Sequence, residues 1–275
     1  PSLVMIGART FTRRAPRELM GWICQRHGFG TYLHQIQGRL DPDTANERDQ
    51  LRRRLVQLGE RQGSGIFMDA IVSPSMQSAL AQSLQVPGIS GMDNNCVMFE
   101  VAGDDADEDF VEVAEMTCFA DLAGKNVLVL RSGENNFGDR AQLHVWIERE
   151  DTDNANLMVL LAYIILGHKA WRGAEMSVFI TVPHDALAVE RARLRDVIRS
   201  GRIPVSEKNI NVIPITSPEG ISAEIDLQSA GADLVILGLP RIEAAAPSTA
   251  ARAFHLHPAL NDVLFVRANE SIHID

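Results

Sequence analysis

The sequence predicts an α/β protein built from two doubly wound subdomains, each with a mainly parallel sheet. Short apolar segments alternate with helical patterns along all 275 residues, and this alternation is typical of parallel strands joined by helical crossovers. Several apolar segments are continuous rather than alternating, such as VLVL (127–130) and LVIL (234–237). Continuous apolar segments are expected of strands that are covered on both faces.

Ten segments have the length and composition of strands. They are residues 3–7, 31–36, 66–72, 95–101, 126–130, 143–147, 176–182, 211–215, 233–239 and 263–267. Helical patterns are predicted between them, at residues 13–28, 44–63, 75–85, 154–171, 185–200, 219–230 and 248–260. In the helix predicted at 44–63, Thr44 and Glu47 fit a capping box and Gly63 fits the end of the helix.

An acidic stretch, GDDADEDFVE (103–112), lies between the two sets of segments. Its like charges repel one another and it has little apolar surface to bury, so we interpret it as a solvated linker. The predicted subdomains are therefore residues 1–112, which include this linker, and residues 113–275, which form the larger subdomain. A surface loop inside a single domain is the alternative interpretation.

The most apolar stretch, LMVLLAYIIL (157–166), is predicted to be a core helix. A helix of this length extends about 15 Å, roughly half of the ~30 Å hydrocarbon thickness of a bilayer. Polar residues flank it on both sides, and the N-terminal segment lacks the features of a secretory signal. Because the chain begins with Pro1, we expect it to be either a processed product or a piece of a longer protein.

Charge and cysteine usage narrow the class of partner and the compartment. The formal net charge of −10 disfavours nucleic acid and anionic membrane surfaces as direct partners. The three cysteines, Cys24, Cys96 and Cys118, have neither metal-binding nor disulfide spacing. They fit a reducing compartment, where buried thiols behave as small apolar side chains.

No segment has the pattern of a catalytic, cofactor or metal site. Gly28 and Gly30 begin like a dinucleotide fingerprint, but the third glycine is missing and the segment leads into a strand. His255 and His257, with Asp262, lack the spacing of metal ligands and are interpreted as a packed or exposed pair. Residues 52–54 are three arginines on different helix faces, which is typical of an ordinary surface.

The segment RSGENNFGDR (131–140) is the one candidate ligand site. It follows a predicted strand, where an open sheet holds its ligands, and it could bind an anion through Arg131, Gly133, Gly138 and Arg140. A mobile loop without a ligand is the alternative, and loop position and composition favour it.

Three parts of the sequence resemble the cytosolic carboxy-terminal domain of cation–chloride cotransporters. The first is the opening strand with its glycine, LVMIGA (3–8). The second is the order LHVWI, LMVLLAYIIL, MSVFI between residues 143 and 180. The third is the closing pair LVILGLP (234–240) and LFVRAN (264–269). The likeness extends over nearly the whole chain in the same order.

This resemblance implies two subdomains that resemble universal stress proteins. It also implies a non-catalytic domain for regulation and dimerisation of an electroneutral transporter that moves Na⁺ and/or K⁺ with Cl⁻. The partners would be a second copy, in a homodimer, and a covalently linked transmembrane domain before Pro1. The domain would lie on the cytoplasmic side of the membrane. Residues 211–240 run without the long insertion of animal members, which favours a prokaryotic protein.

A soluble sensor of the stress-protein type, which would bind a nucleotide or an anion, is the alternative function. Stress proteins that bind ATP carry a glycine-rich phosphate loop after their penultimate strand. The corresponding segment here, GLPRIEAAAPST (238–249), lacks those glycines. Backbone amides cannot approach phosphates closely without them, so we expect no ATP binding in that mode.

Overall fold

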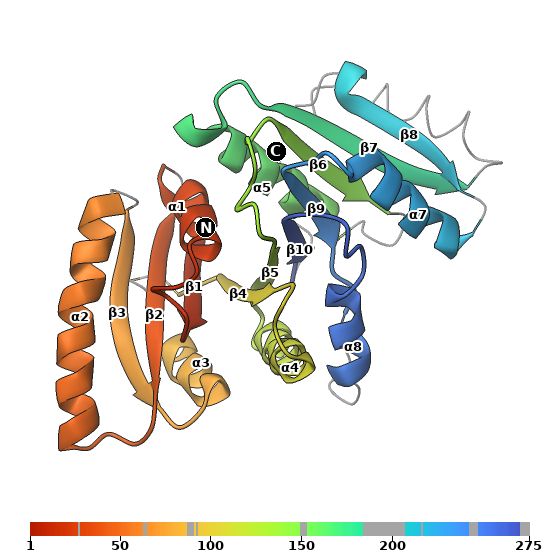
Figure 1. The fold of residues 1–275 in the computed structure, drawn as a ribbon. Coiled ribbons are helices and arrows are strands. Elements are labelled where there is room, and N and C mark those ends of the chain that lie inside the picture. The colour runs from red at the N-terminus through yellow and green to blue at the C-terminus, as the bar shows by residue number, and fades with distance from the viewer. Residues whose placement is uncertain are drawn as a thin grey trace. The chain divides into compact units, whose positions relative to one another are not determined.

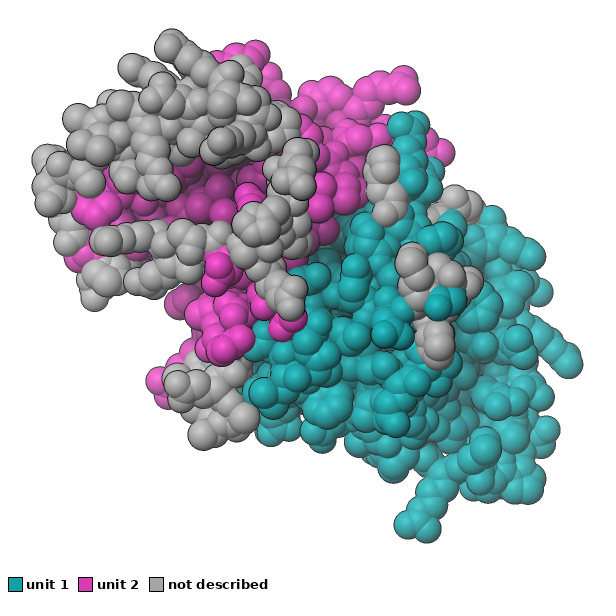
Figure 2. Space-filling model, turned by 180° about the vertical axis from the view of Figure 1, so that it is seen from behind, with its two compact units in different colours: residues 1–130, 242–251 teal, residues 131–241, 252–275 magenta. Residues whose placement is uncertain are grey.

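The computed structural model describes residues 1–26, 28–62, 65–86, 91, 93–148, 153–183, 207–215, 217–241 and 247–269. It divides into two compact units, coloured separately in Figure 2. Unit 1 contains residues 1–130 and 242–251, and unit 2 contains residues 131–241 and 252–275. The chain thus leaves unit 1 at residue 130, later than the boundary predicted at 112. The helix predicted at 185–200 lies outside the described residues.

Unit 1 alternates strands and helices from its first residue (Figure 1). Its elements are β1 (Ser2–Gly7), α1 (Ala15–Cys24), β2 (Phe29–Gln37), α2 (Pro42–Gln62), β3 (Ile66–Ser73), α3 (Met76–Leu84), β4 (Cys96–Ala102), α4 (Asp107–Leu122) and β5 (Asn126–Ser132). The strands lie in the order β3-β2-β1-β4-β5. The order therefore reverses at β1, where α3 carries the chain from β3 back past β1 to β4.

Unit 2 repeats this arrangement. Its described elements are β6 (Gln142–Ile147), α5 (Ala155–Leu166), η2 (Lys169–Trp171), β7 (Glu175–Pro183), η4 (Glu207–Asn209), β8 (Ile210–Ile215), α7 (Pro218–Ser229), β9 (Leu234–Gly238), α8 (Pro247–Phe254) and β10 (Val263–Arg267). The strands lie in the order β8-β7-β6-β9-β10. Counted along its own chain segment, each unit has the order third-second-first-fourth-fifth, so the two units share one topology.

The predicted fold class is confirmed: both units are doubly wound α/β structures with parallel strand pairs. β2 pairs with β1 and β3 in parallel, and β6 pairs with β7 and β9 in parallel. All ten predicted strands are present, with ends that differ by a few residues. The continuous apolar segments at 127–130 and 234–237 are buried along their full length, as expected for strands covered on both faces.

The predicted linker at 103–112 is wrong, because residues 107–122 form α4. The acidic residues Asp107, Glu108 and Asp109 occupy its first turn, where negative charge interacts favourably with the helix dipole. Beyond them the helix buries a stripe that includes Phe110 and Val113 against β4. The charges are therefore the exposed start of an amphipathic helix rather than a connection between domains.

The helix α5 contains the apolar stretch at 157–166 and is a core helix, as predicted. Leu157, Met158, Leu161 and Ile165 are buried, and the helix packs against β6 and β9. None of the helices in the described part of the chain combines the length and the apolar character needed to cross a bilayer.

The start of α2 differs in detail from the predicted capping box. Asp41, rather than Thr44, caps the helix: its carboxylate accepts the N–H groups of Asp43 and Thr44 at 3.0 and 2.9 Å. The Thr44 hydroxyl in turn accepts the N–H of Asp41 at 3.0 Å. The reciprocal bonds of a capping box are present three residues earlier than predicted, with Pro42 at the first helical position, where its missing N–H costs nothing.

Candidate functional site

A cleft lies in unit 1 where the strand order reverses, at the carboxyl ends of β1 and β4. Open α/β sheets hold ligands at this position, because the loops that follow the two strands diverge there. The cleft has a volume of about 300 Å³. Its lining combines an apolar floor, to which Met5 and Phe99 contribute, with the polar side chains of Tyr32 and Gln35 and a charged rim.

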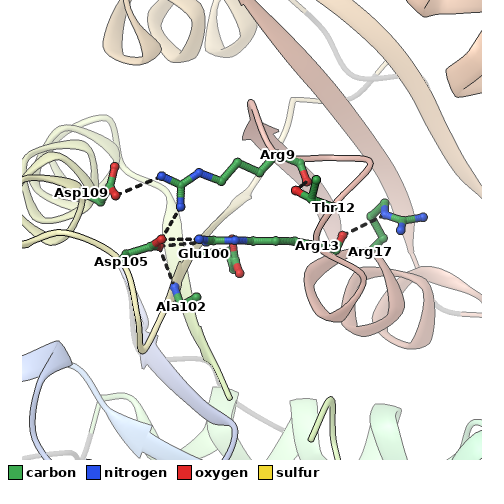
Figure 3. A network of polar contacts seen from close by, with 8 residues as sticks. All are labelled: Arg9, Thr12, Arg13, Arg17, Glu100, Ala102, Asp105 and Asp109. Carbon is green, nitrogen blue, oxygen red and sulfur yellow. Dashed lines mark hydrogen bonds and ion pairs between the residues drawn. The ribbon is translucent and has the colours of Figure 1, made fainter. Parts of the chain in front are cut away.

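Two arginines and three carboxylates form the charged rim (Figure 3). Arg9 and Arg13 extend from the segment after β1 towards Asp105, which follows β4, and both donate hydrogen bonds to its carboxylate. Arg13 also bonds Glu100 at 2.8 Å, and Arg9 bonds Asp109 at 3.1 Å. The ion pairs therefore connect the loops on the two sides of the strand reversal.

Asp105 is the centre of this network. Its carboxylate also accepts the backbone N–H of Ala102 at 2.8 Å. Burial alone would raise the pKa of the Asp105 carboxyl. The hydrogen bonds from Arg13 and Ala102 outweigh burial and hold that pKa below its usual value of 3.8. Asp105 is therefore ionised throughout the physiological pH range.

The segment after β1 is fixed to β2 and α2 by a second set of contacts. The Thr10 hydroxyl, which is fully buried, lies 2.7 Å from Nδ1 of His34. The Phe11 ring packs against the His34 ring, with 5.8 Å between the ring centroids. The Arg54 guanidinium lies over the Phe11 ring, 4.4 Å from its centroid. Burial lowers the pKa of His34 below 6.5 and outweighs the opposing effect of Glu47.

We expect His34 to make the stability of unit 1 depend on pH. Because the pKa of His34 in the folded protein lies below 6.5, the unfolded chain takes up the proton first. Above the pKa of the unfolded chain, the neutral His34 ring contributes fully to the free energy of unfolding. This contribution is lost as the pH falls from that pKa through the lower pKa of the folded protein. Between pH of about 7.5 and about 5.5, the urea midpoint of the wild type should fall further than that of His34→Gln. Parallel changes in the two proteins would contradict this role of His34.

The sequence-predicted ligand residues lie in unit 2: Arg131 is in the last part of β5, and Gly133, Gly138 and Arg140 follow this strand. Arg131 is buried and turns inward: its guanidinium donates to the backbone carbonyls of Phe254, Leu256, His257 and Leu260. A Cβ at Gly133 would collide with Asn261, and a Cβ at Gly138 would collide with Asp233. Gly138 and Arg140 both have positive φ, of 42° and 56°. The structure thus places Gly133, Gly138 and Arg140 in one loop, and Arg131 in β5 with its side chain directed to the protein interior.

The backbone N–H groups of this loop bind carboxylates that belong to the chain itself. Asp262 accepts from Gly133 at 3.1 Å and from Phe137 at 2.7 Å. Asp233 accepts from Asp139 at 3.0 Å and from Ala141 at 2.7 Å. The loop has the donors of an anion site, and internal aspartates occupy these donors. Binding of an external anion by the loop stays a prediction.

The other polar groups singled out in the sequence have structural contacts. Nδ1 of His257 lies 2.7 Å from the Asp226 carboxylate, so His257 and Asp262 contact different partners. Arg52 pairs with Asp69 at 3.5 Å. The unit 1 rim was missed because the segments at 9–13 and 100–109 look unrelated in the sequence. Only the strand order brings them together.

The class of fold follows from these features: in the residues that the structure describes, each unit is a five-stranded doubly wound α/β structure of the kind found in universal stress proteins. A universal stress protein from Archaeoglobus fulgidus DSM 4304 matches with a TM-score of 0.58 at 9% identity, over 96% of this chain and 95% of that chain. A functionally unknown protein from Pseudomonas aeruginosa PAO1 matches with a TM-score of 0.59 at 15% identity, over 98% and 92% of the two chains.

A more particular likeness is to the cytoplasmic domain of a prokaryotic cation chloride cotransporter. The TM-score is 0.62 at 17% identity, and the match covers 99% of this chain and 97% of that domain. At this identity the likeness shows a shared fold. No protein-family model matches the sequence, and no curated protein matches it either.

Proposed function

We propose that this chain is the cytoplasmic regulatory and dimerisation domain of an electroneutral cation–chloride cotransporter, which moves Na⁺ and/or K⁺ together with Cl⁻. The main support is the match to the cytoplasmic cotransporter domain, which includes both units and nearly all of both chains. The resemblance of residues 3–8, 143–180, 234–240 and 264–269 to the same family supports the proposal independently of the structure. The domain would be joined to a membrane-embedded transport domain and would pair with a second copy.

The proposed domain is not an enzyme, and its reactive side chains are in keeping with this. Burial raises the pKa of the Cys24 and Cys96 thiols to about 12. A thiol with so high a pKa is almost entirely protonated at neutral pH and is a poor nucleophile. In the unit 1 cleft, the carboxylates of Asp105 and Glu100 are held by guanidinium groups. Held in this way, they are poorly placed to exchange protons with a substrate.

Chloride-dependent cation uptake tests the proposal directly. Vesicles that contain the full-length gene product should take up rubidium in chloride medium. Uptake should fall to the level of empty vesicles when gluconate replaces chloride. A second protein that lacks residues 1–275 should show altered uptake if the domain regulates transport, or should lose cross-linked dimers if it serves assembly. Uptake that does not depend on chloride would contradict the proposal.

A nucleotide or anion sensor of the stress-protein type is the second candidate, and the cleft of about 300 Å³ at the strand reversal of unit 1 favours it. Calorimetric titration of residues 1–275 with ATP up to about 1 mM distinguishes the two candidates. A nucleotide sensor should bind ATP with a dissociation constant well below about 1 mM, which this range of concentrations detects. We expect no binding heat. Micromolar affinity would favour the sensor and would contradict the expectation drawn from residues 238–249.

A further inference from the structure

The rim of the unit 1 cleft has one firmly anchored side. The segment after β1 is held to β2 and α2 by the Thr10–His34 contact and by the packing of Phe11 between His34 and Arg54. Thr10 is fully buried, and salt has little effect on contacts between uncharged groups such as the Thr10 hydroxyl and the Phe11 and His34 rings. This side of the cleft is therefore expected to stay in place when the ionic strength changes.

The opposite side is joined to it by the ion pairs of the rim. Two guanidinium groups, Arg9 and Arg13, face three carboxylates, Glu100, Asp105 and Asp109. Two positive charges against three negative charges leave a net charge of −1 in the rim. If either arginine withdraws, the remaining carboxylates repel one another across the turn between β4 and α4.

The two arginines differ in their exposure to solvent. The Arg13 side chain is 18% exposed, and its partners Glu100 and Asp105 are 7% and 6% exposed. The Arg9 side chain is 47% exposed, and it bonds both Asp109, which is 36% exposed, and the same buried Asp105. Mobile ions screen exposed pairs strongly and buried pairs weakly. Salt should therefore weaken the Arg9–Asp109 pair most, whereas the two Arg13 pairs should resist it.

We propose that Arg9 is an ionic-strength-sensitive latch on the unit 1 cleft. At low salt it holds Asp109 as well as Asp105, and so keeps the first turn of α4 against the segment after β1. At high salt the Arg9–Asp109 pair is screened and the first turn of α4 moves away from Arg9, which widens the rim there, while Arg13 keeps Asp105 and Glu100 in place. This inference rests on the rim alone, so it stands whether or not the chain belongs to a cotransporter.

Amide hydrogen exchange of residues 1–275 tests the latch. When KCl is raised from about 0.1 M to about 1 M, the Debye length falls from about 10 Å to about 3 Å. Amides in residues 107–110, in the first turn of α4, should then exchange about two- to fivefold faster, the range expected for loss of an exposed ion pair. Amides in the middle of α2 serve as the internal reference. Arg9→Gln should exchange at the high-salt rate already at low salt and should not respond further.

Arg48→Gln is the matched control, because Arg48 also belongs to an exposed ion pair, with Asp49 at 3.1 Å, but lies outside the rim. It should keep the full salt response at residues 107–110. Potassium glutamate should act like KCl at equal ionic strength. A wild type without salt response would overturn the latch, and so would an unchanged response in Arg9→Gln. An effect of chloride that glutamate does not reproduce would also overturn it, because binding of chloride would then replace screening as the cause.

Discussion

Replacement of Arg131 by alanine should lower the free energy of unfolding of unit 2 by about 3–4 kcal/mol, since several charge-assisted hydrogen bonds of about 1.5–3 kcal/mol each are lost and are not additive. The Arg131 side chain is 5% exposed. Its Nη1 donates to the carbonyls of Phe254, at 3.2 Å, and Leu256. Its Nη2 donates to those of His257, at 2.7 Å, and Leu260, at 3.2 Å. One guanidinium thus satisfies the carbonyls at the end of α8 and in the turn after it.

Urea unfolding followed by tryptophan fluorescence measures this effect, because Trp146 and Trp171 are both buried in unit 2. Arg131→Lys should lie between the wild type and Arg131→Ala, since an ammonium group keeps the charge but not the planar fork of donors. Arg172→Ala is the control: it removes an exposed arginine of the same unit. A midpoint of Arg131→Ala equal to that of Arg172→Ala would show that the carbonyls find other donors.

The strands were predictable from the sequence because a strand that is buried on both faces is a continuous apolar segment. A segment such as 234–237 must be apolar at every position, and this can be read without knowledge of its neighbours. The order of the strands is not local, but parallel pairing with helical crossovers restricts it to few choices. The fold class therefore followed from the sequence.

The helix α4 was missed because its charges and its apolar face overlap in sequence. Asp107, Glu108 and Asp109 dominate the first turn, and a count of charges over 103–112 conceals Phe110. The helix becomes recognisable only when Phe110, Val113 and Thr117 are read together, at spacings of three and four residues. A window that ended at residue 112 excluded most of that pattern.

The polar contacts of the cleft and the loop could not be predicted, because each joins distant parts of the chain. Arg9 and Asp105 are 96 residues apart, and Arg131 lies 123 to 129 residues from the carbonyls that it binds. The sequence shows that the segment 131–140 follows a strand. It does not show whether Arg131 faces solvent or the interior, since that depends on how the chain returns after α8. The Arg131 side chain, which suggested an anion site, instead donates hydrogen bonds to backbone carbonyls at the end of α8 and in the turn after it.

Replacement of Asp262 by alanine should have the second largest effect, a loss of about 2–4 kcal/mol, because it leaves a buried N–H group without an acceptor. Asp262 is fully buried. Its carboxylate accepts the N–H of Phe137 at 2.7 Å and that of Gly133 at 3.1 Å. Asn136 and Phe137 have positive φ, of 48° and 64°, which is unfavourable for side chains other than glycine. The two hydrogen bonds therefore hold a strained turn whose Phe137 side chain is itself buried.

Two further variants separate the hydrogen bonds from the charge. Asp262→Asn keeps one acceptor oxygen at the same place, so it should lose less stability than Asp262→Ala. Asp139→Ala removes a carboxylate from the exposed part of the same loop but keeps its backbone N–H, so its urea midpoint should stay close to that of the wild type. If Asp262→Ala unfolds at the same urea concentration as Asp139→Ala, burial of Phe137 rather than the Asp262 carboxylate holds the turn in its left-handed conformation.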